Sequence, residues 1–195
     1  MIEKSARKMI SLLINRNLIS KEQKNMYQYS FELLISALVN LLLVLLLGSL
    51  FHSLGETLVF LFFFCTLKRY TGGFHMPGYQ SCILFFGALY TMLLTVDKLC
   101  SISITSGFFL SVLISAAFIA RFSPVESTNK ALTPEERKIL SRKAMLLLVF
   151  TTTLFTFFYL HSLMQIAKFI GYALILIAIL MAAGLLQNRL EVRHD

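Results

Sequence analysis

Two side chains in this sequence could do covalent chemistry together: a histidine, His75, and a cysteine, Cys82, seven residues further on. On one continuous α-helix they would lie about 10 Å apart along the axis, which is too far for a hydrogen bond. The segment also contains Gly72-Gly73 and Pro77-Gly78, and these residues allow the chain to turn back on itself. His75 would then be the general base for a Cys82 thiolate nucleophile.

The expected surroundings of Cys82 suit this role. It enters the first turns of a predicted helix, where the positive end of the helix dipole and an imidazolium neighbour both favour a thiolate. A second interpretation stays open from the residues alone, because cysteine is often simply buried and a lone histidine is often structural. The other residues of these types are weaker candidates, since they lie in an apolar run or at outer helix ends: Cys65, Cys100, His52 and His161.

The elements that must position these residues are transmembrane helices. The chain has 195 residues, of which 57% are hydrophobic and 14% charged, and its mean hydropathy is +0.75. Soluble domains have about 45–50% apolar and about 25% charged residues. The composition excludes the water-soluble globular classes and predicts an all-α integral membrane protein. Residues 1–195 are expected to form a single polytopic membrane domain, because no stretch resembles a linker between two domains.

Six apolar runs are expected to cross the bilayer. They cover residues 31–51, 55–67, 83–96, 102–120, 144–163 and 166–186, with a tight turn between the last two. The second run is short for a span, so four spans are the alternative count.

Residues 1–24 form a predicted amphipathic helix ahead of the first span. The apolar residues Ile2, Ala6, Met9, Ile10 and Leu13 share one helical stripe, and the charges lie on the far side. A helix of this kind lies in the head-group plane of a membrane. Packing against the rest of the protein is the alternative.

Positive charges indicate the orientation. Lys and Arg are retained on the cytoplasmic side in short loops, and six spans with an inner N-terminus leave only Lys98 and Lys168, of 18 such residues, outside. Both termini and segment 68–82 are therefore expected in the cytoplasm. The net charge of +8 favours anionic lipid or an acidic partner over nucleic acid, because the cations lie between apolar segments.

The largest polar break, residues 121–143, is an expected cytoplasmic loop. Thr133 is a predicted N-cap, because Pro134 follows at the first helical position and Glu135 and Glu136 lie in the first turn. A short helix should begin there and continue into the fifth span.

The residues around the His and Cys pair resemble a family signature. Arg69, Gly73, His75 and Cys82 fall in the pattern R-x-x-x-G-x-H-x₆-C, which is similar to that of the accessory gene regulator B (AgrB) family. Its members are membrane cysteine endopeptidases that process quorum-sensing pro-peptides in Gram-positive bacteria. The resemblance extends to the size, the amphipathic N-terminus and a segment with Pro124-Val125-Glu126 and Asn129-Lys130, so it covers essentially the whole chain.

The resemblance implies a function and partners. Cys82 would be the nucleophile and His75 the base, cleaving the acidic tail from a small amphipathic pro-peptide through a thioester. A side chain of the peptide would capture the thioester and close a thiolactone or lactone ring. The family also implies a homodimer in the cell membrane and no metal or organic cofactor. One departure from the family pattern is Met76-Pro77, where relatives place a small residue after the histidine.

Further residues carry two interpretations each. Arg69, with Lys68, either binds an acidic tail or is a topology charge. Gly72 and Gly73 serve backbone geometry, and their N–H groups could help form an oxyanion site. Glu126 or Asn129 either orients His75 or is a solvated loop residue.

A transporter or binding protein for a small peptide or solute is the alternative function. Few ionisable groups in the spans could line a polar path, because Asp97 and Lys98 lie at a helix end and Glu32 and Glu56 near interfaces. The sequence therefore favours the enzyme.

Overall fold

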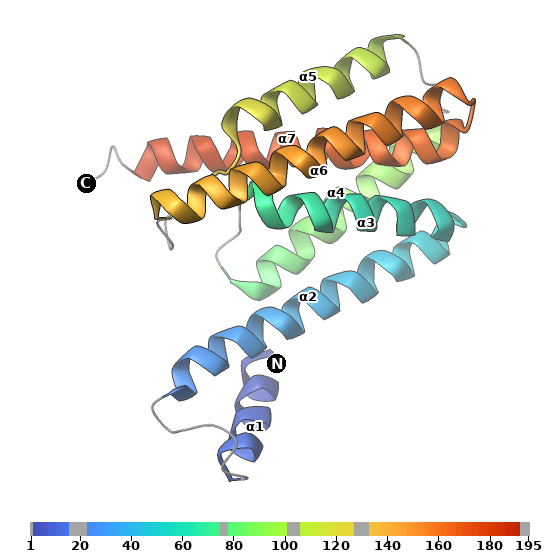
Figure 1. Cartoon of the computed structure of the whole chain (residues 1–195). Coiled ribbons are helices and arrows are strands. Elements are labelled where there is room, and N and C mark those ends of the chain that lie inside the picture. The colour runs from blue at the N-terminus through green and yellow to red at the C-terminus, as the bar shows by residue number, and fades with distance from the viewer. Residues whose placement is uncertain (1, 16–22, 75–77, 101–105, 127–132, 192–195) are drawn as a thin grey trace. The chain divides into compact units, whose positions relative to one another are not determined.

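The chain is built from α-helices wherever its structure is described. The computed structural model describes residues 2–15, 23–74, 78–100, 106–126 and 133–191. Within these ranges all the regular elements are α-helices, as expected for an all-α protein (Figure 1). They are α1 (Ile2–Asn15), α2 (Lys24–Leu50), α3 (Leu54–Thr71), α4 (Tyr79–Cys100), α5 (Ser106–Phe122), α6 (Pro134–Leu160) and α7 (Met164–Glu191).

Each of the six predicted apolar runs coincides with a helix in the described part of the chain. Four helices, α2, α4, α6 and α7, are long and apolar enough to cross a membrane, while α5 is apolar but shorter. Helix α3 has 18 residues and extends beyond the predicted run, to include the charged residues Lys68 and Arg69. The integral membrane class is thus confirmed, and the choice between four and six spans stays a prediction.

Helix α6 begins where the sequence predicted a helix start. The Glu136 N–H donates to Thr133 Oγ1 at 3.2 Å, and the Thr133 N–H donates to Glu136 Oε2 at 3.0 Å. This reciprocal capping box satisfies two donors that a helix start leaves without partners. The helix then continues without a break to Leu160. Only residues 161–163 separate it from α7, as predicted.

Helix α1 contains the predicted amphipathic stripe in part. Ala6 and Ile10 are buried, with exposed fractions of 0% and 1%, whereas Met9 and Leu12 are exposed at 46% and 61%. The helix therefore both packs within the protein and presents apolar side chains outward. Residues 16–22, which belong to the predicted 1–24 helix, lie outside the described part of the chain.

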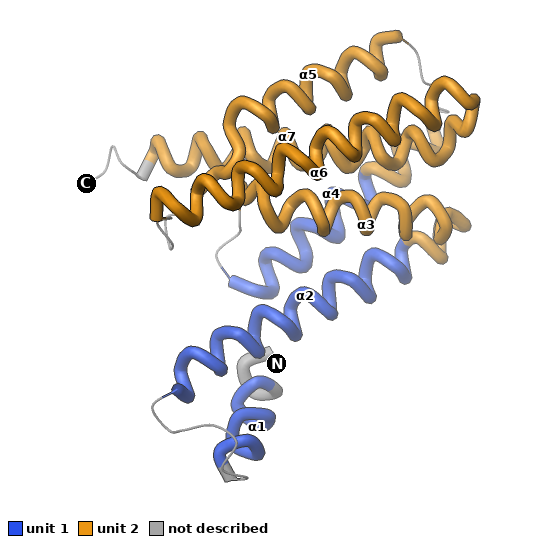
Figure 2. The backbone as a smooth tube through the Cα atoms, viewed as in Figure 1, with its two compact units in different colours: residues 1–47, 76–92 blue, residues 48–75, 93–195 orange. Residues whose placement is uncertain are grey.

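The described chain divides into two compact units (Figure 2). Unit 1 contains residues 1–47 and 76–92, and unit 2 contains residues 48–75 and 93–195. Helix α7 is the centre of unit 2, because it packs against α3, α5 and α6. Its sequence is apolar all round, which is typical of a helix buried among other helices. Side chains buried almost completely follow one another along it: Phe169, Ile170, Leu174, Ile177 and Met181.

Unit 2 also buries an ion pair between the end of α4 and the start of α7. Lys168 Nζ lies 2.7 Å from Asp97 Oδ1, and the Tyr172 hydroxyl donates to the same oxygen at 2.9 Å. The Lys168 and Asp97 side chains are 8% and 7% exposed. The sequence placed both residues at outer helix ends, and the structure buries them there because each neutralises the other.

Candidate active site

Cys82 lies in the first turn of α4, as the sequence predicted. Its backbone N–H donates to the carbonyl oxygen of Gly78 at 3.2 Å. Gly78 has φ of 91°, a conformation in which a side chain would be strained. The Cys82 side chain is half-buried. It is therefore placed at the positive end of a helix dipole, where a negative charge is favoured.

The predicted partner of Cys82 falls outside the described residues. His75 lies in the undescribed range 75–77, which also contains Met76-Pro77, and Asn129 lies in the range 127–132. The approach of His75 to Cys82 thus stays a prediction. The chain leading to His75 is described as far as Phe74, and its contacts can be followed.

Gly72 and Gly73 end α3 in a conformation that requires glycine. Their φ values are 68° and 110°. The Gly72 N–H donates to the Lys68 carbonyl oxygen at 3.2 Å and closes the last turn of α3. A β-carbon on Gly72 would collide with the carbonyl oxygen of Val125. The predicted geometric role of these two glycines is consistent with this backbone.

Gly72 and Gly73 form a turn, here called the glycine turn, which residues of unit 2 hold in place. The Val125 N–H donates to the Thr71 carbonyl oxygen at 2.8 Å, and Gly72 pairs with Val125 in a parallel bridge. Lys68 Nζ donates to the Gly72 carbonyl oxygen at 2.7 Å. On the other side, the Phe74 N–H donates to the Leu180 carbonyl oxygen of α7 at 2.9 Å.

Gly184 of α7 makes that last contact possible. A β-carbon there would lie 2.7 Å from the Phe74 nitrogen and 2.9 Å from the Gly73 carbonyl carbon. These are backbone atoms, which cannot move aside as a flexible side chain can. Sequence reasoning missed Gly184. Its only signal is a glycine inside an otherwise apolar helix, which often marks a close approach of another chain segment.

Lys68 and Arg69 have different surroundings. The Lys68 ammonium holds the glycine turn, so the structure gives it a role that the sequence did not predict. Arg69 is exposed, with its guanidinium carbon 5.9 Å from the centre of the Tyr70 ring. Lys143 Nζ of α6 lies 5.8 Å from the same ring. Two cations on one aromatic ring form a positive surface at this end of α3 and α6.

Glu126 is held at both its main chain and its side chain. Asn188 Nδ2 of α7 donates to the Glu126 carbonyl oxygen at 2.9 Å, and the carboxylate lies 3.5 Å from Arg137 Nη1. The side chain is half-buried. This ion pair differs from the expected contact with His75, which stays untested. The hydrogen bond from Asn188 holds the main chain at Glu126, next to Val125, which pairs with Gly72.

The chain is similar to proteins of a known family. The family model for accessory gene regulator B, AgrB, matches residues 6–185. The chain belongs to the AgrB family. Membership assigns it to the accessory gene regulator system and confirms the resemblance seen in the sequence.

Two AgrB-like relatives come from Clostridium perfringens. AgrB-like protein 2 of strain 13 (type A) is 30% identical over 139 residues, which cover 64% of this chain and 61% of the relative. An AgrB-like protein of strain SM101 (type A) is 28% identical over 154 residues, covering 71% of this chain and 68% of the relative. No solved structure matches the chain.

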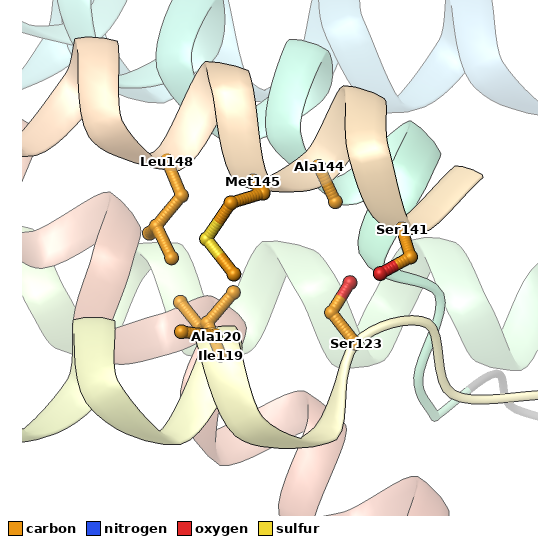
Figure 3. A pocket seen from close by; sticks show the side chains of 7 residues that line it. All are labelled: Ile119, Ala120, Ser123, Ser141, Ala144, Met145 and Leu148. Atoms are coloured by element: carbon orange, nitrogen blue, oxygen red, sulfur yellow. The ribbon is translucent and has the colours of Figure 1, made fainter. Parts of the chain in front are cut away.

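Unit 2 also contains a crevice that is lined mostly by apolar side chains. It lies between the end of α5 and α6, and Figure 3 shows the Ser123 and Ser141 hydroxyls turned toward each other at one end of it. The rest of its lining is apolar: Ile119, Ala120, Ala144, Met145 and Leu148. These lining residues include neither a base nor a thiol.

The close approach at Gly184 predicts a strong effect of a small substitution. Gly184→Ala should destabilise the protein by about 1–3 kcal/mol, the usual cost of overpacking, and should break the hydrogen bond from Phe74 to Leu180. Hydrogen exchange measured by mass spectrometry on the peptide containing Phe74 should become faster. Gly55→Ala is the matched control, because a β-carbon at Gly55 would meet no atom within 4 Å. Equal protection of Phe74 in all three proteins would contradict the prediction.

Proposed function

We propose that this AgrB-family chain is a membrane-embedded cysteine endopeptidase and peptide cyclase. Its substrate is a small amphipathic quorum-sensing pro-peptide with an acidic C-terminal tail. The observation that carries the proposal is the place of Cys82 in the first turn of α4, soon after a glycine turn that unit 2 holds by several contacts. Family membership adds the expected substrate class.

In the proposed reaction, His75 takes the proton from the Cys82 thiol. The thiolate attacks the carbonyl carbon of the scissile peptide bond, and N–H donors stabilise the oxyanion that forms. The C–N bond then breaks, and the leaving amine of the acidic tail receives the proton from His75. The remaining acyl group is a thioester on Cys82. A thiol or hydroxyl of the same peptide attacks this thioester, closes the thiolactone or lactone ring and releases Cys82.

The proposal includes recognition and location. Exposed Arg69, next to Lys143 on the Tyr70 ring, fits the binding of an acidic tail by charge. The distribution of cations along the chain supports a cytoplasmic active site with both termini inside the cell. A homodimer in the cell membrane is proposed from the family alone. The chemistry needs no metal or organic cofactor, because the thiolate is the nucleophile and the thioester conserves the energy for ring closure.

Co-expression with a candidate precursor tests the function. The precursor is a short peptide with an internal Cys or Ser and an acidic tail, encoded next to this chain. Mass spectrometry of the cells and the medium should detect the tail and a cyclic peptide that is lighter than the linear acid by one water. Intact precursor in the medium would instead favour the exporter. Only intact precursor inside the cells would contradict both functions.

A further inference from the structure

Helix α2 contains a buried carboxylate that the proposed reaction does not use. Glu32 is 8% exposed, although the sequence suggested an interfacial position. Its Oε1 accepts a hydrogen bond from Gln28 Nε2 at 2.9 Å, and its Oε2 accepts one from the Tyr79 hydroxyl at 3.0 Å. A buried carboxylate is costly unless such donors satisfy it. The two donors therefore account for the burial, and they come from different helices.

The two hydrogen bonds have different consequences. Gln28 lies one turn before Glu32 on α2, so its bond stays within one helix. Tyr79 is the first residue of α4, 47 residues further along the chain, and its bond joins α4 to α2. All of these residues belong to unit 1.

Tyr79 is also a neighbour of the proposed nucleophile. Residues three apart lie side by side on a helix surface, and Cys82 is three residues after Tyr79. The first turn of a helix frays easily, because its N–H groups have no partners within the helix. A charge-assisted hydrogen bond at the first residue opposes this fraying.

We infer that Glu32 and Tyr79 are positioning residues, which hold the first turn of α4 and so fix the place of the Cys82 thiol. The inference rests on the proposed function, in which Cys82 is the nucleophile. In this role Glu32 acts on Cys82 through the Tyr79 hydroxyl and the backbone of α4. The pair thus links α2 to the geometry of the thiol.

The test compares two variants of the full-length protein in lipid nanodiscs. Tyr79→Phe removes the bond between α4 and α2, and Gln28→Leu removes the other bond to the same carboxylate. For Tyr79→Phe, the kcat of precursor cleavage should fall by about tenfold or more. A hydrogen bond to a charged group changes the equilibrium between the held and the released arrangement by at least about tenfold. The KM should stay within about twofold. Gln28→Leu should keep the wild-type kcat.

A double variant separates positioning from the cost of a buried charge. Glu32→Met with Tyr79→Phe removes both partners, so the thermal stability should recover, because no buried carboxylate is left without a donor. The kcat should remain low, because the bond between the helices is still absent. Recovery of kcat in the double variant, equal losses in Tyr79→Phe and Gln28→Leu, or an unchanged kcat in Tyr79→Phe would each overturn the inference.

A reaction without a precursor separates this inference from the proposed function. The rate of Cys82 alkylation by N-ethylmaleimide, in a chain without Cys65 and Cys100, should change at least severalfold in Tyr79→Phe and stay constant in Gln28→Leu. If Cys82→Ala still cleaves the precursor, the proposed function is wrong, but this comparison still reports on the placement of the thiol. An alkylation rate that is the same in both variants and in wild type would overturn the positioning role.

Discussion

Cys82→Ala should abolish cleavage of the precursor while the protein still inserts into the membrane at its normal level. The thiol is the atom that would form the thioester, and removal of a protease nucleophile costs on the order of 10⁶ in rate. The substitution keeps the hydrogen bond from the residue 82 N–H to the Gly78 carbonyl oxygen, because that bond belongs to the backbone. Activity should be measured by quantitative mass spectrometry of the released tail.

Variants of the other cysteines are the controls. Cys65 is exposed in the middle of α3, and Cys100 is the last residue of α4. Cys65→Ala and Cys100→Ala should each retain most of the activity. Cys82→Ser should be poor, because a hydroxyl is far less acidic than a thiol and gives little alkoxide nucleophile. Full processing by Cys82→Ala would refute the assignment of the nucleophile.

Lys168→Met should cause the largest loss of stability among substitutions away from the active site. It leaves Asp97 buried with a hydrogen bond from Tyr172 but without its cation. Asp97 must then keep an uncompensated charge or take up a proton, and breaking a buried pair in this way costs about 3–5 kcal/mol. Thermal unfolding of the purified protein in detergent should show a clearly lower midpoint, and the protein should accumulate to a lower level in cells.

Two further variants show whether the pair is responsible. Lys98→Met removes the same charge from an exposed position next to Asp97 in the sequence, and should leave the midpoint almost unchanged. Asp97→Asn combined with Lys168→Met removes both charges and keeps an acceptor for Tyr172. This double variant should recover most of the lost stability. A midpoint of Lys168→Met equal to that of Lys98→Met would show that the pair contributes nothing.

Local features of the fold were predictable from the sequence. The apolar runs located the helices, since burial in a bilayer requires apolar residues in unbroken stretches. Thr133 marked the start of α6, because capping depends on neighbouring residues only. Gly72, Gly73 and the start of α4 near Cys82 were equally local signals. The family resemblance supplied the expected chemistry of His75 and Cys82.

The contacts between distant helices were not predictable in the same way. Asp97 and Lys168 are 71 residues apart, and Glu32 and Tyr79 are 47 apart. The sequence shows each charge in its own segment, where it looks interfacial, and contains no signal for its partner. Gly184 is a similar case, because its role depends on the path of Gly73 and Phe74 across α7. Pairing between helices therefore had to come from the structure.

The position of α7 in the chain has a consequence for biogenesis. The ribosome makes α7 after the other described helices, and α7 carries Lys168, Leu180 and Gly184. Until it has entered the membrane, Asp97 lacks its cation and Phe74 lacks the acceptor that fixes the segment before His75. The glycine turn can therefore reach its described arrangement only late in synthesis. A nascent chain without α7 would hold the Asp97 carboxylate near the end of α4 without the cation that neutralises it.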